Sequence, residues 1–129
     1  MAKLVKKQDK DFKDYLPNAI RIADILEGFK AKNIKAFDVT EHTIMTDCIL
    51  MCSGTSDPQL KAMFNGVKRG MKEVGAPLYH SEGEIGGNWL LLDYGTIFVH
   101  IFREEAYDFY DLEGFWADAE SVDLELDED

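Results

Sequence analysis

The segment Gly86–Phe102, GGNWLLLDYGTIFVHIF, decides the fold, because two apolar runs flank a short turn in the manner of a β-hairpin. With Tyr94 and Gly95 as a two-residue turn, the strand register follows. One face of the hairpin then carries Leu92 opposite Ile97, Leu90 opposite Val99 and Asn88 opposite Ile101. This face is almost wholly aliphatic and is predicted to lie in the core.

The opposite face of the hairpin mixes large rings with a carboxylate and an imidazole. The same register pairs Trp89 with His100 and Leu91 with Phe98, and it places Asp93 at the turn. Aromatic residues of this kind are enriched at the centres of protein interfaces. A second layer of helices covering the face is an equally open alternative. As a partner surface, the face comprises Trp89, Leu91, Asp93, Phe98, His100 and Phe102.

The chain of 129 residues is long enough for one domain with a sizeable core. Residues 1–16 are rich in Lys and Asp without a clear period, and we expect a flexible N-terminal arm there. Residues 17–117 form the predicted domain. Residues 118–129 hold seven of the acidic residues and no basic one. We expect an acidic, disordered tail that is dispensable for folding.

The net charge of −11 argues against non-specific nucleic-acid binding, which depends on Lys and Arg. A basic protein is the better electrostatic partner. The chain has no apolar run of membrane-spanning length and its start lacks a secretory signal, so we expect a cytosolic protein. Cys48 and Cys52 lie within an apolar run and are predicted to be free thiols.

The remaining elements follow from periodicity and turn signals. A helix is expected from Pro17 with an apolar stripe that faces a sheet, and a second helix from Ser56 or Asp57 to Gly75. Strands are expected at 34–39, 47–53 and 76–80, and a last helix begins near Glu104. Together with the hairpin this gives an α/β (α+β) domain, a single mixed five-stranded sheet flanked by helices.

The cysteines and histidines raise two possibilities, a zinc site and a cysteine nucleophile. A zinc site would need four converging ligands, and Cys48, Cys52 and the histidines at 42, 80 and 100 show no suitable spacing. A cysteine nucleophile paired with His100 has no supporting local signature. We expect no metal and no cofactor.

The segment CSGTSD resembles the Gly-Ser opening of nucleotidyltransferases. That chemistry places two or three carboxylates around Mg²⁺, and here Asp47 and Asp93 would have to act alone. A well-capped helix is the simpler interpretation of this segment. The loop Glu82–Gly83–Glu84 is similarly interpreted as a solvated turn.

Four segments in order resemble the ribosomal silencing factor family, also called Iojap-like, over residues 18–116. They are TDCILMCSGTSD, the EG pair at Glu82 and Gly83, NWLLLDYGTIFVHIF and YDLEGFW. The resemblance does not extend to the N-terminal arm or the acidic tail. It implies a nucleotidyltransferase-like α/β architecture without the catalytic motif, in a protein that is not an enzyme.

The resemblance also implies a partner. Members of this family bind a basic ribosomal protein on the subunit-joining face of the large ribosomal subunit and sterically block the small subunit. They repress translation when nutrients are scarce and form homodimers when free. The family's W-x-x-x-D-x-G pattern and following His carry over to Trp89, Asp93, Gly95 and His100, with Gly95 serving the turn. The absence of an evident transit peptide favours the bacterial cytoplasm.

Overall fold

A computed structural model describes residues 13–84 and 86–126. Its centre is a single mixed sheet of six strands in the order β3-β4-β5-β2-β1-β6, one more than the sequence predicts. The central pair, β2 and β5, is parallel, and the other neighbours are antiparallel. The strands are β1 (Lys32–Asp38), β2 (Cys48–Gly54), β3 (His80–Glu82), β4 (Trp89–Asp93), β5 (Ile97–Arg103) and β6 (Glu120–Ser121).

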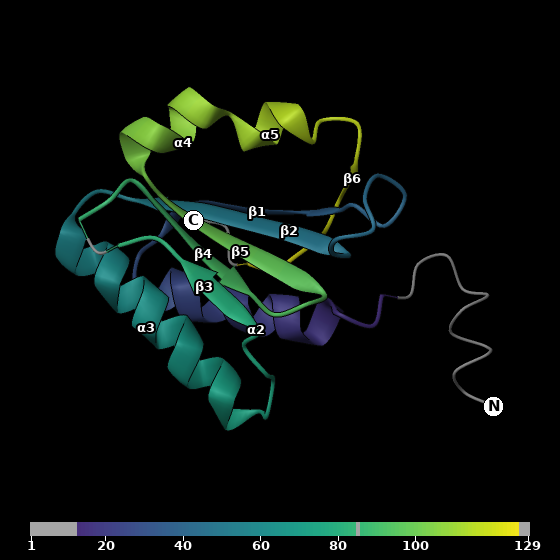
Figure 1. Cartoon of the computed structure of the whole chain (residues 1–129), viewed down its shortest axis with the longest axis horizontal. Coiled ribbons are helices and arrows are strands. Elements are labelled where there is room, and N and C mark those ends of the chain that lie inside the picture. Colours follow the sequence, from purple (N-terminus) through teal and green to yellow (C-terminus); the bar gives the residue numbers. More distant parts are fainter. Residues whose placement is uncertain (1–12, 85, 127–129) are drawn as a thin grey trace.

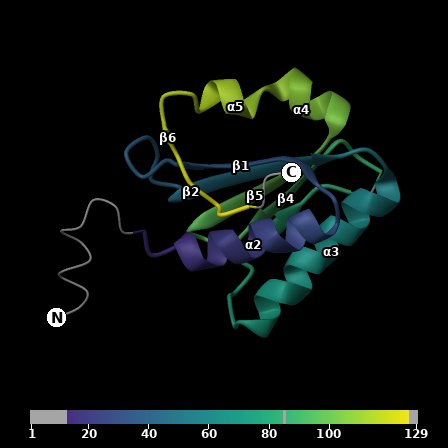
Figure 2. The ribbon, with the colours of Figure 1, turned by 180° about the vertical axis from the view of Figure 1, so that it is seen from behind.

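Helices cover both faces of this sheet. The long helices α2 (Leu16–Gly28) and α3 (Asp57–Glu73) pack together on one face, as Figures 1 and 2 show from opposite sides. The shorter helices α4 (Glu104–Tyr110) and α5 (Leu112–Phe115) lie over the other face. The second helix layer that the sequence left open as an alternative is therefore present, although it is short.

The hairpin has the predicted faces but a different register. The backbone N–H of Tyr94 donates to the Ile97 carbonyl, so the two loop residues are Gly95 and Thr96. Trp89 therefore lies opposite Phe102 instead of His100, and Leu91 lies opposite His100. Because the shift is two residues in every pair, each side chain still points to the predicted face.

The two faces are buried to different degrees. On the side of α2 and α3, the side chains of Leu50, Leu90, Leu92, Val99 and Ile101 are at most 1% exposed. On the side of α4 and α5, a smaller cluster centres on Met51 and Phe102, and Trp89, Phe98 and Trp116 pack against it while remaining partly exposed.

The helices begin and end largely where the turn signals predict. Pro17 lies in the first turn of α2. In α3 the cap is Ser56, whose hydroxyl accepts a hydrogen bond from the Gln59 amide at 3.2 Å. Asp57 instead pairs with Arg103. The strand expected at 76–80 lies further along the chain, as β3 (His80–Glu82), and shares only His80 with the prediction.

The predicted acidic tail is ordered as far as Leu126, contrary to the expectation of disorder. It forms β6, which pairs with β1. Beyond it, Val122 and Leu124 are 8% and 6% exposed and join the core on the α2 side, whereas Asp123 and Glu125 are exposed. The alternation of apolar and acidic residues is that of a strand-like segment with one buried side. Residues 127–129 lie outside the described residues.

The last residues of the predicted N-terminal arm pack on the domain, contrary to the expectation of a flexible segment up to residue 16. Residues 1–12 lie outside the described residues, but the side chain of Tyr15 is buried and its hydroxyl donates to Asp38 at 2.5 Å. Lys13 lies 3.5 Å from Asp38 and 3.2 Å from Glu120. Burial by itself raises the pKa of Asp38, but hydrogen bonds from Thr40 and Tyr15 outweigh it and leave the pKa lowered. The start of α2 and the tail are thus both fastened to the end of β1.

Candidate functional site

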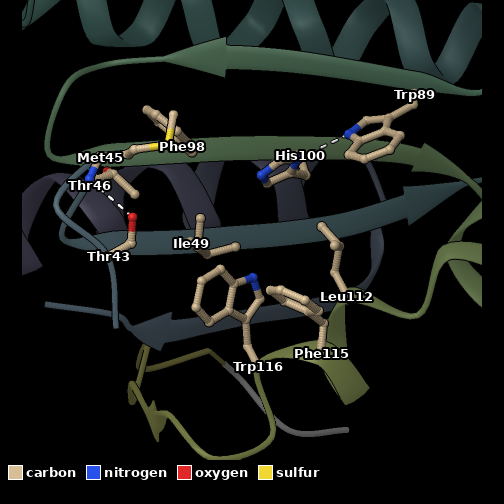
Figure 3. Close-up of a pocket in the computed structure, with 10 residues that line it drawn as sticks. All are labelled: Thr43, Met45, Thr46, Ile49, Trp89, Phe98, His100, Leu112, Phe115 and Trp116. Carbon is tan, nitrogen blue, oxygen red and sulfur yellow. Dashed lines mark hydrogen bonds between the residues drawn. The ribbon is translucent and has the colours of Figure 1, made fainter. Parts of the chain in front are cut away.

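An open apolar groove of about 230 Å³ lies on the sheet face that carries α4 and α5 (Figure 3). Its walls come from the strands β2, β4 and β5, from the loop before β2, and from the region of α5. We call it the apolar groove, and its lining residues are Thr43, Met45, Thr46, Ile49, Trp89, Phe98, His100, Leu112, Phe115 and Trp116.

On the strand side of the groove, two of the predicted site residues, Trp89 and His100, contact each other. The indole Nε1 of Trp89 donates to Nδ1 of His100 at 2.9 Å (Figure 3). The Trp89 ring also packs 4.9 Å from the ring of Phe102 and 4.7 Å from that of Tyr110. These contacts hold the indole between the sheet and α4.

Burial determines the charge of His100. Its side chain is only 9% exposed, and desolvation lowers its pKa to about 4. The imidazole is therefore neutral near pH 7. With Nδ1 accepting from Trp89, the proton of the neutral ring is assigned to Nε2.

The helix side of the groove depends on how α5 is fixed. Asp111 adopts a left-handed conformation with φ of 50°, and its carboxylate accepts from the Gly114 amide at 3.0 Å, which caps α5. Glu113 accepts from Lys35 at 2.7 Å and from the Tyr107 hydroxyl at 2.8 Å. The hydrogen bond from Lys35, followed by that from Tyr107, lowers the pKa of Glu113. These bonds tie α5 to β1 and α4.

The loop before β2 closes the third side. The Thr46 hydroxyl donates to the Gly95 carbonyl at 2.9 Å, and Thr43 Oγ1 accepts from the Met45 amide at 3.1 Å. The side chain of Met45 is 70% exposed and that of Ile44 is fully exposed. The sequence gives no sign that Thr43, Met45 and Thr46 border the groove, because the loop, the strands and α5 come together only in the folded chain.

Five of the six predicted partner residues separate into three groups, and the sixth, Asp93, belongs to the hairpin turn. Trp89, Phe98 and His100 line the apolar groove. Leu91 lies with Trp89, Glu82 and Gly83 in a second hollow of about 250 Å³ beside β3. Phe102 is only 1% exposed beneath α4, so its side chain supports the surface without forming it.

Asp93 and Gly95 both serve the hairpin turn. The Asp93 carboxylate accepts from the Gly95 amide at 2.7 Å, and Gly95 has φ of 84°, in the region that favours glycine. Gly83 is also more than a solvated turn residue. It has φ of 103°, and a Cβ there would lie 2.5 Å from the carbonyl oxygen of Trp89.

The alternative chemistries find little geometric support. Cys48 and Cys52 face the core on the α2 side, opposite to His100, and burial raises the pKa of Cys48 to about 12. His42 packs against Trp116 and His80 pairs with Glu82, so the three histidines lie apart. Within the described residues no group of three or more metal-ligating side chains converges.

The two carboxylates of the nucleotidyltransferase alternative lie on opposite sides of β5. Asp47 directly precedes β2, and Asp93 ends β4. Strands two places apart are separated by about 10 Å, and one carboxylate oxygen of Asp93 already accepts from the turn. This arrangement does not bring the pair together around one Mg²⁺ ion.

Comparison with known proteins agrees with this architecture. The profile of a family described as "Ribosomal silencing factor during starvation" matches residues 13–129, which includes the tail. The chain belongs to this family. Within the described residues, no helix has the length and apolar composition needed to cross a lipid bilayer.

Individual relatives extend the comparison. A ribosomal silencing factor RsfS from Chromobacterium violaceum is 34% identical over 93 residues, which cover 72% of this chain and 76% of the relative. A crystal structure of a protein from the same organism is similar with a TM-score of 0.77 at 30% identity, covering 81% of this chain and 88% of that one. A mouse relative, 28% identical over 74% of this chain and 43% of its own length, is named mitochondrial assembly of ribosomal large subunit protein 1.

Proposed function

We propose that this ribosomal silencing factor binds a basic protein on the subunit-joining face of the large ribosomal subunit through the apolar groove. Once bound, it sterically blocks the small subunit and lowers translation in nutrient limitation. The family supports a role at the ribosome, and the name of the mouse relative supports the large subunit. The observation that carries the proposal is the exposed aromatic lining of the groove.

The groove has the composition of an interface centre. The side chains of Phe115 and Met45, which border the groove from α5 and from the loop before β2, are 73% and 70% exposed. On α4, Phe109 and Tyr110 are 80% and 47% exposed, and the Tyr110 ring packs on Trp89. Aromatic residues and methionine are enriched at protein interfaces, where a few of them supply most of the binding energy.

Charge favours a basic partner at the same face. Residues 104–118 hold six acidic residues and no basic one: Glu104, Glu105, Asp108, Asp111, Glu113 and Asp118. Two lysines of β1 approach this segment, and both are paired, Lys35 with Glu113 and Lys32 with Glu104. Complementary charge would steer a basic protein to this face and orient it there.

The proposal also concerns the oligomeric state and the cellular location of the protein when it is not bound to the ribosome. We expect a homodimer in solution, because a second copy would cover the exposed apolar rim until the ribosome replaces it. The similarity to a bacterial silencing factor supports the bacterial cytoplasm. The protein has no enzymatic role in this proposal. The competing nucleotidyltransferase-like function predicts stoichiometric, Mg²⁺-dependent binding of a nucleoside triphosphate, which calorimetry would detect.

The direct test removes two exposed groove residues together, as Met45→Ala with Phe115→Ala. Both side chains are mostly exposed, so the melting temperature should remain nearly unchanged. Affinity for purified large subunits, measured by co-sedimentation, should fall about thirtyfold or more, the effect of losing one aromatic anchor. Inhibition of subunit joining should weaken in parallel.

Tyr79→Ala is the matched control, because Tyr79 is a 68% exposed aromatic residue outside the groove lining. It should bind large subunits as the unmodified protein does. Equal binding by the double variant and the control would show that the partner uses another surface.

A further inference from the structure

Helix α3 carries a row of cations along its exposed side. Lys61, Lys68 and Lys72 are spaced by seven and four residues, so they lie on one helical face, and Arg69 lies next to them. All four side chains are exposed. We call these four residues the basic row. It spans about 16 Å from Lys61 to Lys72 at 1.5 Å per residue.

In the part of the chain that the structure describes, the basic row differs from most other cations in having no carboxylate partner. Lys13, Arg21, Lys32, Lys35 and Arg103 each lie within 4.0 Å of an acidic side chain. Within residues 13–84 and 86–126, no carboxylate lies that close to any member of the row. Lys68 makes a contact of a different kind, since its Nζ lies 5.2 Å from the ring centroid of the half-buried Phe64.

The row also lies away from the acidic groove face. Helix α3 is on the opposite side of the sheet from α4 and α5 (Figure 1). Ile25 of the neighbouring α2 packs closely at Gly70 of α3, and Phe29, directly after α2, packs closely at Gly66. These glycines occupy another helical face from Lys61, Lys68 and Lys72, so the row is left open to solvent. A protein of net charge −11 thus has one basic helix face and one acidic groove face.

We infer that the basic row contacts phosphates of ribosomal RNA while the groove face holds its protein partner. This inference rests on the proposed function. Free RNA should bind weakly, because the net negative charge of the protein opposes it. On the large subunit, the first contact would hold the row beside RNA at high effective concentration, and three or four local cations can then displace counterions.

The experiment measures affinity for purified large subunits between 50 and 200 mM salt. The test variant is Lys61→Gln, Lys68→Gln and Lys72→Gln together. Each lost phosphate contact should reduce the slope of log affinity against log salt by roughly 0.7 to 0.9. The unmodified protein should therefore lose roughly 20 to 40 times more affinity across this range than the variant loses.

Two further variants separate a local contact from a change of net charge. Replacing the same three lysines with Arg should retain the original slope, since the cations remain. Combining the Gln variant with Asp24→Asn, Asp123→Asn and Glu125→Gln restores the net charge of −11 by neutralising exposed acidic residues outside the acidic segment 104–118. Affinity should stay reduced in this combined variant if the row itself contacts phosphate.

The outcomes distinguish this inference from the function on which it rests. If the unmodified protein fails to bind large subunits, the proposed function fails. If it binds, but the Gln variant shows the same affinity and slope, the row has no RNA contact and only this inference is overturned. Restoration of affinity in the charge-restored variant would likewise overturn it, because net charge would then explain the loss.

Discussion

The two faces of the sheet show how one set of strands serves stability on one side and recognition on the other. On the α2–α3 face, long helices and the tail bury the aliphatic side chains almost completely. On the α4–α5 face, two helices of seven and four residues leave an open groove between them and the loop before β2. The same strands supply both faces, because neighbouring residues of a strand point to opposite sides of the sheet. The faces differ in the length of the helices that lie over them. Changes at adjacent strand positions should therefore have different consequences.

The largest effect on stability is expected from the tail, which contributes to the closed face. Truncation after Ala117 removes the buried side chains of Ala119, Val122 and Leu124. At roughly 1.5 to 3 kcal/mol for each large apolar side chain, the free energy of unfolding should fall by about 5 kcal/mol. Thermal melting should show a decrease of well over 10 °C, if the shortened chain folds at all.

Truncation after Leu126 is the matched control for the tail. It removes three acidic residues that follow the last described position, and the melting temperature should change little. If the chain that ends at Ala117 also melts normally, the tail does not contribute to the closed face, and the comparison between the faces loses one of its supports.

The tail was mispredicted for a physical reason. Its acidic residues dominate its composition and resemble those of disordered segments. Val122, Leu124 and Leu126 alternate with them, which is the pattern of a strand with one buried side. Three alternating apolar residues among so many acidic ones are too few to predict a strand. The edge of β1 that receives them is not visible in the local sequence.

The hairpin was predicted more successfully. Alternation alone assigned Leu90, Leu92 and Val99 to the core and Trp89 and His100 to the other face. The turn was placed one residue early, which moved each cross-strand pair by two and so left the faces unchanged. The groove itself was not predictable, because Met45 and Phe115 are distant in sequence and come to line one groove only in the folded chain.

The second prediction compares two residues of β4. Leu92 is fully buried on the closed face, and Leu92→Ala should lower the free energy of unfolding by about 2 to 5 kcal/mol. Trp89 lies on the open face and is partly exposed, so Trp89→Ala should cost less stability. The proposed function adds a decrease of about thirtyfold or more in affinity for large subunits, because Trp89 lines the groove.

Denaturant unfolding and co-sedimentation on both variants check this comparison. The Leu92 variant should keep its affinity in the fraction that remains folded, whereas the Trp89 variant should lose affinity while folded. A Trp89 variant that is as unstable as the Leu92 variant, and yet binds normally when folded, would assign Trp89 to the core and not to recognition.

The smallest effect is expected from protonation of His100, the buried imidazole of the open face. Its pKa is about 4 in the folded protein, below the value of about 6.5 for an unperturbed histidine. The unfolded chain therefore binds a proton at a higher pH than the folded protein does. The stability contributed by the neutral imidazole is fully present above about pH 6.5 and is lost as the pH falls toward 4.

The full shift corresponds to about 3 kcal/mol, at 1.36 kcal/mol for each pKa unit. His100→Gln removes the titration and offers Trp89 an amide oxygen in place of Nδ1. Urea unfolding of both proteins should show a constant difference in stability above pH 7. Below about pH 6.5 the unmodified protein should lose stability relative to the variant. Partly buried carboxylates such as Asp38 also titrate in acid, but they are common to both proteins and cancel in the difference. A difference that stays constant from pH 7 to 4 would mean that water reaches the imidazole, and the open face would then be less closed at His100 than its burial indicates.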